Sequence, residues 1–126
     1  MTIVLDTSVL IDVLRGDDAA RVALEGAVHS GERLVASVLT RLEVLAGARP
    51  EETTAIQLLL NSLEWIAVDE QLADDAGQLA ARYLRSHPGI DSVDYVIAAS
   101  ALRLQAALWT RNLKHFPMFE RLESPY

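Results

Sequence analysis

The feature that most constrains the fold of this chain is the alternation of short apolar runs with longer runs of helical periodicity. Runs that suit buried strands cover 2–6, 33–37, 65–68 and 107–110, and 119–122 is a candidate for a short fifth strand. Helices are predicted over 8–15, from the cap Asp17 to Gly31, and over 38–46, 51–63, 70–86 and 92–105. Such alternation predicts an α/β fold with a mostly parallel central sheet of four to five strands, flanked by helices.

Length and composition indicate a folded protein of one domain. The 126 residues match one domain of ordinary size, and the hydrophobic content of 51% is too high for a disordered chain. The lack of cysteine excludes disulfides and thiolate zinc sites, and it fits a cytoplasmic location. No apolar run approaches the roughly 18 residues of a membrane span, so we expect no membrane partner.

The charge of the chain argues against a large nucleic-acid footprint. Eighteen acids against eleven bases give a formal net charge of −7, whereas most nucleic-acid binders present a basic face. The last quarter of the chain nevertheless gathers four basic residues, which are Arg103, Arg111, Lys114 and Arg121. Arginine is well suited to grip phosphate with two parallel hydrogen bonds.

Three carboxylates are placed where an apolar strand meets a helix. Asp6 follows the first strand, Glu43 lies one turn into the helix after 33–37, and Asp94 opens the helix over 92–105. The carboxyl ends of parallel strands share one edge of a sheet, which is where ligands bind. Carboxylates beside an apolar sheet are costly unless their charge is bound, so together they suggest a site for a hard divalent cation such as Mg²⁺ or Mn²⁺.

Each of these acids also has a purely structural interpretation. Asp6 could cap the following helix, although Thr7 or Ser8 could do so as well. Glu43 could face solvent and pair with Arg41 or Arg49.

Asp91 lies three residues before Asp94, so the pair could form a reciprocal cap at the start of its helix. That interpretation suits Asp91 better than Asp94, because the residues after Asp94 are apolar.

Four segments together resemble the PIN-domain ribonucleases, and among them the VapC-type toxins of toxin–antitoxin pairs. The segments are VLDTSVLIDVL, SVLTRLEVLAG, DSVDYVIAASAL and LWTRNLKHFP, and their order and spacing cover nearly the whole chain. The resemblance implies a single PIN-like nuclease domain over 1–126. It also implies an RNA substrate, a cognate VapB-like antitoxin and a homodimer.

The resemblance assigns metal binding and catalysis to Asp6, Glu43 and Asp94, with Mg²⁺ or Mn²⁺ as the ion that supports hydrolysis of RNA. Ser8 and Thr110 match positions that orient ligands or phosphate near the site. We further expect Arg111 and Lys114 to hold RNA phosphates. Because the chain is acidic overall, we expect modest RNA affinity with few phosphate contacts.

The chain departs from the family pattern at a fourth acid that often follows the last strand. Asn112 and His115 stand at those positions. Asn112 can still offer an oxygen ligand, and Asp91 is an auxiliary candidate. The missing charge leaves open a second interpretation, a PIN-fold binding module with weak or no cleavage that acts through antitoxin or RNA contacts.

Three other enzyme or signalling classes fit the residues less well. A phosphoaspartyl phosphatase needs a second Asp two residues after the first, where Ser8 stands. A receiver domain needs an acidic pair beside Asp6, which is absent. A metal-independent ribonuclease needs paired histidines, and the three histidines, His29, His87 and His115, are far apart in sequence.

Overall fold

The computed structural model describes residues 1–126 and contains one parallel four-stranded sheet. The strands are β1 (Thr2–Leu5), β2 (Arg33–Ser37), β3 (Glu64–Ile66) and β4 (Ala107–Trp109), arranged in the order β3-β2-β1-β4. In the centre of the sheet, Val4 of β1 lies opposite Val35 of β2 and Leu108 of β4. The predicted α/β fold with a parallel sheet is confirmed.

Six helices connect these strands. They are α1 (Thr7–Leu14), α2 (Asp18–His29), α3 (Val38–Ala46), α4 (Thr53–Asn61), α5 (Glu70–Tyr83) and α6 (Ser92–Leu104). Two short 3₁₀ turns are added, η1 (Pro50–Glu52) and η2 (Leu113–His115). Five of the six α-helices begin at an Asp or Ser whose side chain accepts a backbone N–H bond, namely Asp6, Asp17, Ser37, Asp69 and Asp91.

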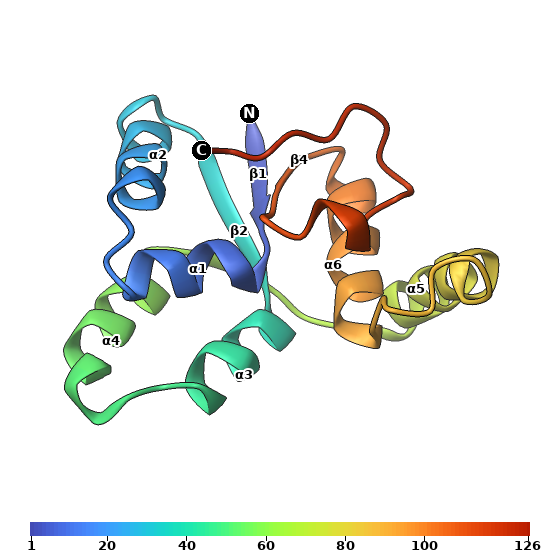
Figure 1. Ribbon diagram of the computed structural model, residues 1–126, viewed down its shortest axis with the longest axis horizontal. Helices are drawn as coiled ribbons and strands as arrows, with labels where there is room; N and C mark the ends of the chain where they lie inside the picture. The colour runs from blue at the N-terminus through green and yellow to red at the C-terminus, as the bar shows by residue number, and fades with distance from the viewer.

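Helices cover both faces of the sheet (Figure 1), with α1, α2 and α4 on one side and α6 and α5 on the other. Alternation along β1 explains this, because Ile3 and Leu5 enter the first core cluster while Val4 enters a second with Ile97 of α6. A third cluster joins α5 to α6 around Leu72 and Tyr95.

The order of the strands creates a switch point between β1 and β4. The chain passes from β1 outward to β2 and β3, and then returns through α5 and α6 to β4 on the other side of β1. Asp6 and Thr110 follow these two neighbouring strands, and the Asp6 N–H bonds to the Trp109 carbonyl at 2.9 Å. Crevices at such points are the usual ligand sites of open α/β sheets.

The predicted fifth strand over 119–122 is wrong. Arg121 has a left-handed backbone with φ of 57°, which a strand cannot continue. The apolar residues Phe119 and Leu122 instead pack against the cluster around Phe116.

Two predicted helices are also shorter in the structure. The one expected over 51–63 is split into η1 and α4, and the one expected over 70–86 ends at Tyr83. No helix in the structure combines the length and apolar character needed to cross a membrane.

Candidate active site

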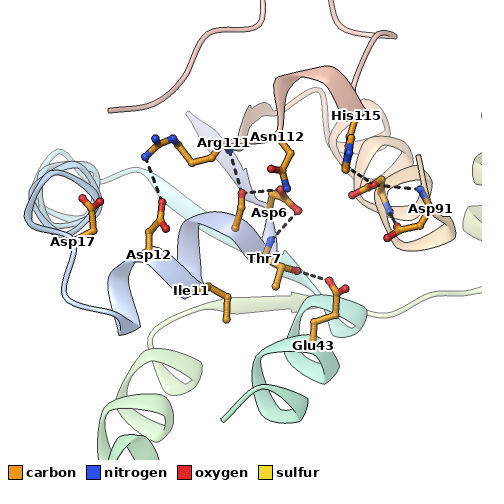
Figure 2. Close-up of a pocket in the computed structure, with 12 residues that line it drawn as sticks. Asp6, Thr7, Ile11, Asp12, Asp17, Glu43, Asp91, Arg111, Asn112 and His115 are labelled. Atoms are coloured by element: carbon orange, nitrogen blue, oxygen red, sulfur yellow. Dashed lines mark hydrogen bonds and ion pairs between the residues drawn. The ribbon is translucent and has the colours of Figure 1, made fainter. Parts of the chain in front are cut away.

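A polar pocket with a volume of about 530 Å³ lies beyond the carboxyl ends of β1 and β4. Figure 2 shows its side chains arranged around Asp6, with Asp91 and His115 on one side and Asp12, Asp17 and Arg111 on the other. Ile11 is the one hydrophobic residue among those that line it. The full lining is Asp6, Thr7, Ser8, Ile11, Asp12, Asp17, Glu43, Asp91, Asp94, Arg111, Asn112 and His115.

Asp6 is held at the centre of the pocket by hydrogen bonds alone. Its side-chain Oδ1 accepts the Thr7 N–H at 2.8 Å, while Oδ2 accepts the hydroxyls of Ser8 at 2.9 Å and Thr110 at 2.7 Å. Asp6 therefore is the cap of α1, and Thr7 and Ser8 do not take that role. The residue is only 3% exposed and has no cationic partner, so a buried negative charge remains to be balanced.

Ser8 and Thr110 tie the two strand ends together around this carboxylate. The Arg111 N–H donates to Ser8 Oγ at 3.1 Å, and the Asn112 N–H donates to Thr110 Oγ1 at 2.9 Å. Each hydroxyl thus accepts a hydrogen bond from a backbone N–H and donates one to Asp6. The structure places both hydroxyls against Asp6, and the role in orienting ligands or phosphate that the resemblance implies for them stays a prediction.

Glu43 reaches the pocket from α3 and is partly buried. Its Oε1 accepts the Thr7 hydroxyl at 2.6 Å, which links α3 to the start of α1. The surface ion pair considered for Glu43 does not form. Arg41 lies over the Trp65 ring at 5.1 Å, and Arg49 precedes η1, where its backbone N–H bonds Glu52.

Asp94 and Asp91 form a reciprocal cap at the start of α6. The Asp94 N–H donates to Asp91 Oδ1 at 2.9 Å, and the Asp91 N–H donates to Asp94 Oδ2 at 3.3 Å. Asp94 is thus both a buried residue, 7% exposed, and part of the cap. His115 Nδ1 lies 3.0 Å from the same Asp94 Oδ2.

The electrostatics around Asp94 are unfavourable to its charge. Burial, followed by the nearby Asp91 carboxylate, raises the pKa of Asp94 to about 6, and Asp6 adds to the rise. The hydrogen bond from the Asp91 backbone and the proximity of His115 oppose this shift without cancelling it. A cation at this position would remove the repulsion.

The oxygens present fit a hard divalent ion. No three acidic or histidine side chains are close enough to bind one ion together. Mg²⁺ needs no such cage, because it keeps several waters and takes one or two protein carboxylates. Asp6 and Asp94, which are buried and have no basic partner other than His115, offer that set, and Glu43 and Asn112 line the same pocket.

Sequence reasoning missed three polar residues of the pocket, which are Thr7, Asp12 and Asp17. Asp17 was assigned only as the cap of α2, which it is, since its Oδ1 accepts the Ala20 N–H at 2.9 Å. Asp12 follows Ser8 by four residues, so both lie on one face of α1. That spacing could have identified Asp12.

Of the four basic residues near the end of the chain, only Arg111 lines the pocket. Lys114 is exposed in η2, next to the pocket, in a shallow depression shared with Arg111 and His115. Arg103 and Arg121 are elsewhere, because Arg103 pairs with Asp69 and Asp75 on α5 while Arg121 lies beside β4. The two residues expected to hold RNA phosphates, Arg111 and Lys114, therefore lie at or beside the pocket, and their phosphate contacts stay a prediction.

Comparisons with known proteins show the family of this chain. The family model described as PIN domain matches residues 3–121. The chain is 46% identical to "Ribonuclease VapC19" and 41% identical to "Ribonuclease VapC10", both of Mycobacterium tuberculosis. The alignments cover 97% and 98% of this chain and 98% and 92% of those proteins.

A solved structure of similar fold is "Toxin-antitoxin complex from Klebsiella pneumoniae". It is 27% identical with a TM-score of 0.78, over 98% of this chain and 97% of the other. The family match includes every residue that lines the pocket, and the two Mycobacterium tuberculosis relatives are well above 30% identical to this chain. This chain belongs to the PIN-domain family and, within it, to the VapC group.

Proposed function

We propose that this protein is a metal-dependent endoribonuclease and the toxin of a type II toxin–antitoxin pair, with its nuclease domain spanning 1–126. The observation that carries the proposal is the polar pocket in which Asp6 and Asp94 are buried without an arginine or lysine partner. The names of the VapC relatives support ribonuclease activity for the same fold.

PIN-domain ribonucleases depend on a divalent metal ion, and Mg²⁺ or Mn²⁺ suits the oxygen donors of this pocket. Asp6 and Asp94 would hold the ion directly, and Glu43, which lines the same pocket, would act on it through the water molecules that such an ion keeps. When bound, such an ion lowers the pKa of water and stabilises negative charge on a phosphoryl group, which is the chemistry that phosphodiester hydrolysis requires.

The other residues of the pocket position these acids and the substrate. Ser8 and Thr110 fix the orientation of Asp6, and Thr7 fixes that of Glu43. Asp91 starts α6 and so places Asp94.

On the substrate side, Arg111 and Lys114 supply positive charge for RNA phosphates beside an otherwise acidic pocket. Asn112 offers an amide oxygen at the same rim. Few cations face the pocket, so we expect RNA affinity that depends only moderately on salt.

The partners follow from the same assignment. Structural neighbours include the toxin–antitoxin complex of Klebsiella pneumoniae and VapBC-1 from nontypeable Haemophilus influenzae, which is 28% identical with a TM-score of 0.74. We therefore assign this chain a VapB-like antitoxin that silences it, and a homodimeric toxin.

One observation supports a second function, that of a binding module. Asn112 and His115 line the pocket at the positions where the resemblance led us to expect a further acid, and His115 contacts Asp94. A PIN-fold binding module with little cleavage would act through its antitoxin or RNA contacts. Its function would survive Asp6→Asn, whereas the enzyme would be inactivated.

The test is cleavage of a mixed RNA pool in Mn²⁺ by wild type, by wild type with EDTA, and by Asp94→Asn. Cleavage by the first sample alone supports the proposal, and mapping the new ends gives the cut sites. Cleavage that persists with EDTA and in Asp94→Asn contradicts the mechanism. Folded, antitoxin-free wild type that binds RNA or antitoxin without cleaving favours the binding module.

A further inference from the structure

Three residues that are far apart in sequence meet at the pocket rim away from Asp91 and His115. The Tyr126 hydroxyl donates to Asp12 Oδ2 at 2.6 Å, and Arg111 Nη1 lies 3.4 Å from the same oxygen. The Arg111 guanidinium also lies over the Tyr126 ring, 4.9 Å from its centre. Figure 2 shows Arg111 reaching across the rim toward Asp12. The metal chemistry proposed above does not require these contacts.

Packing and a hydrogen bond hold the Tyr126 side chain in place. Its side chain packs against the core cluster between the sheet and α1, α2 and α4. Figure 1 shows the last segment of the chain returning across the sheet to reach that side. Burial and the bond to Asp12 raise the pKa of Tyr126 far above its usual range, so the hydroxyl remains a donor at every physiological pH.

The hydrogen bond from Tyr126 weakens the contact between Asp12 and Arg111. Because Tyr126 makes the short bond to Asp12 Oδ2, Arg111 keeps only a long contact with that oxygen through one terminal nitrogen. The guanidinium also approaches the Tyr126 hydroxyl, but the Arg111 side chain is still 44% exposed, and its backbone N–H is anchored to Ser8 beside the central carboxylate. The guanidinium is therefore oriented but still available to an anion.

We propose that Tyr126 and Asp12 are positioning residues that hold Arg111 at the rim, where it binds a phosphate of single-stranded RNA next to the cleaved bond. This inference rests on the proposed ribonuclease function. A planar guanidinium matches two phosphate oxygens, and stacking on an aromatic ring limits the freedom it would lose on binding. Without the Tyr126 hydroxyl, Asp12 has only Arg111 as a partner and competes with the phosphate for it.

The experiment compares wild type with Tyr126→Phe, Arg111→Ala and their combination. The matched control is Tyr83→Phe, because Tyr83 lies on α5 and its ring contacts only His87 edge-on among the aromatic residues. The probe is a fluorescent pool of short single-stranded RNA of random sequence. Binding is measured by anisotropy in EDTA, and kcat and KM are measured separately with Mn²⁺.

We expect Tyr126→Phe to weaken RNA binding and raise KM by about fivefold with kcat unchanged, since the ion pair between Arg111 and the phosphate is weakened equally in the ground and transition states. Arg111→Ala should weaken binding further and reduce the slope of log affinity against log salt by about 0.7. In the Arg111→Ala background, Tyr126→Phe should have no further effect on binding.

Three results would overturn the inference. One is binding and KM of Tyr126→Phe equal to those of Tyr83→Phe. Another is a lower kcat or melting temperature without a change in KM, which indicates a structural role. The third is an effect of Tyr126→Phe that persists without Arg111. Wild type that neither binds nor cleaves the pool removes the proposed function itself, whereas cleavage by wild type with any of the three results removes only this inference.

Discussion

Two acidic clusters, one at the start of α5 and one at the start of α6, have opposite electrostatics. Asp69 caps α5, accepting the Leu72 N–H at 2.7 Å, and Arg103 donates to its two oxygens at 3.1 and 3.2 Å. Arg103 also approaches Asp75 at 4.0 Å. The bond from Arg103, followed by that from the Leu72 backbone, holds the pKa of Asp69 below its ordinary value.

Asp91 caps α6 in the same way, but no arginine or lysine enters its cluster. The buried neighbour, Asp94, has a pKa raised to about 6 by burial and by Asp91 and Asp6. A paired acid such as Asp69 stabilises the fold, while an unpaired buried acid costs stability. We infer that the cluster around Asp94 binds a cation in the folded protein.

The largest effect that separates the two clusters is on catalysis. Asp94→Asn should lower RNA cleavage by at least about a hundredfold, because even outer-shell changes at metal sites cost 10–100-fold. Without metal at neutral pH, the same variant should be more stable than wild type, since the repulsion is gone. Cleavage rates and urea unfolding in EDTA measure the two effects.

Asp69→Asn is the matched control for this prediction. It removes a carboxylate from a helix cap of the same kind, outside the pocket. Cleavage should remain at the wild-type level while the free energy of unfolding falls. Equal losses of cleavage in both variants would contradict the distinction between the clusters.

Metal binding should stabilise one cluster and not the other. At a Mn²⁺ concentration of about 100 times Kd, linkage gives about 2.7 kcal/mol, which is a rise in melting temperature of roughly 5–10 °C for a domain of this size. Asp69→Asn should keep the whole rise, and Asp6→Asn and Asp94→Asn should lose it. Differential scanning fluorimetry with and without Mn²⁺ measures it, and an unchanged rise in Asp94→Asn would place the ion elsewhere.

The residues that sequence reasoning placed correctly are those fixed by strand and helix boundaries. Asp6 and Thr110 follow strands, and Asp91 and Asp94 open a helix, so the parallel topology alone brings them to one edge. Arg103 is close to Asp94 in sequence but does not line the pocket. It lies nine residues along α6 from Asp94, which is about 13 Å along the axis.

Residues that depend on tertiary packing were not predicted. Asp12 reaches the pocket because of the direction in which α1 leaves β1, and its partner Tyr126 is 114 residues away in sequence. The segment over 119–122 was a candidate for a short fifth strand, and the packing of Phe119 and Leu122 and the left-handed backbone at Arg121 exclude it.

The two clusters should also respond to pH in opposite directions. The folded-state pKa of Asp94 is raised from 3.8 to about 6, so the folded protein favours its protonated form. The stability that Asp94 contributes without metal is therefore fully present below about pH 4 and is lost as pH rises through 6. The pKa of Asp69 is lowered, so its contribution is present above its unfolded value and is lost as pH falls.

Urea unfolding in EDTA from pH 4 to 7 tests these signs. Relative to Asp94→Asn, wild type should lose roughly 1–2 kcal/mol of stability as pH rises over this range. Relative to Asp69→Asn, wild type should change little over this range and should lose stability when the pH falls below about 4, since the pKa of Asp69 is lowered from 3.8. Cleavage should increase as pH passes 6, with a midpoint that moves lower as Mn²⁺ is raised, because the ion competes with the proton on Asp94.

The smallest effect concerns the acid that this chain lacks at the rim. Asn112 lines the pocket with its side chain exposed, and its N–H is bound to Thr110 beside Asp6. Asn112→Asp adds a fourth charge, so it should tighten Mn²⁺ binding by about threefold and slightly lower the metal-free melting temperature. Asn61→Asp, at the exposed end of α4, changes the net charge equally and should leave Mn²⁺ affinity unchanged. Equal tightening in both variants would mean that the ion responds to overall charge, and the rim position would then have no special part in holding it.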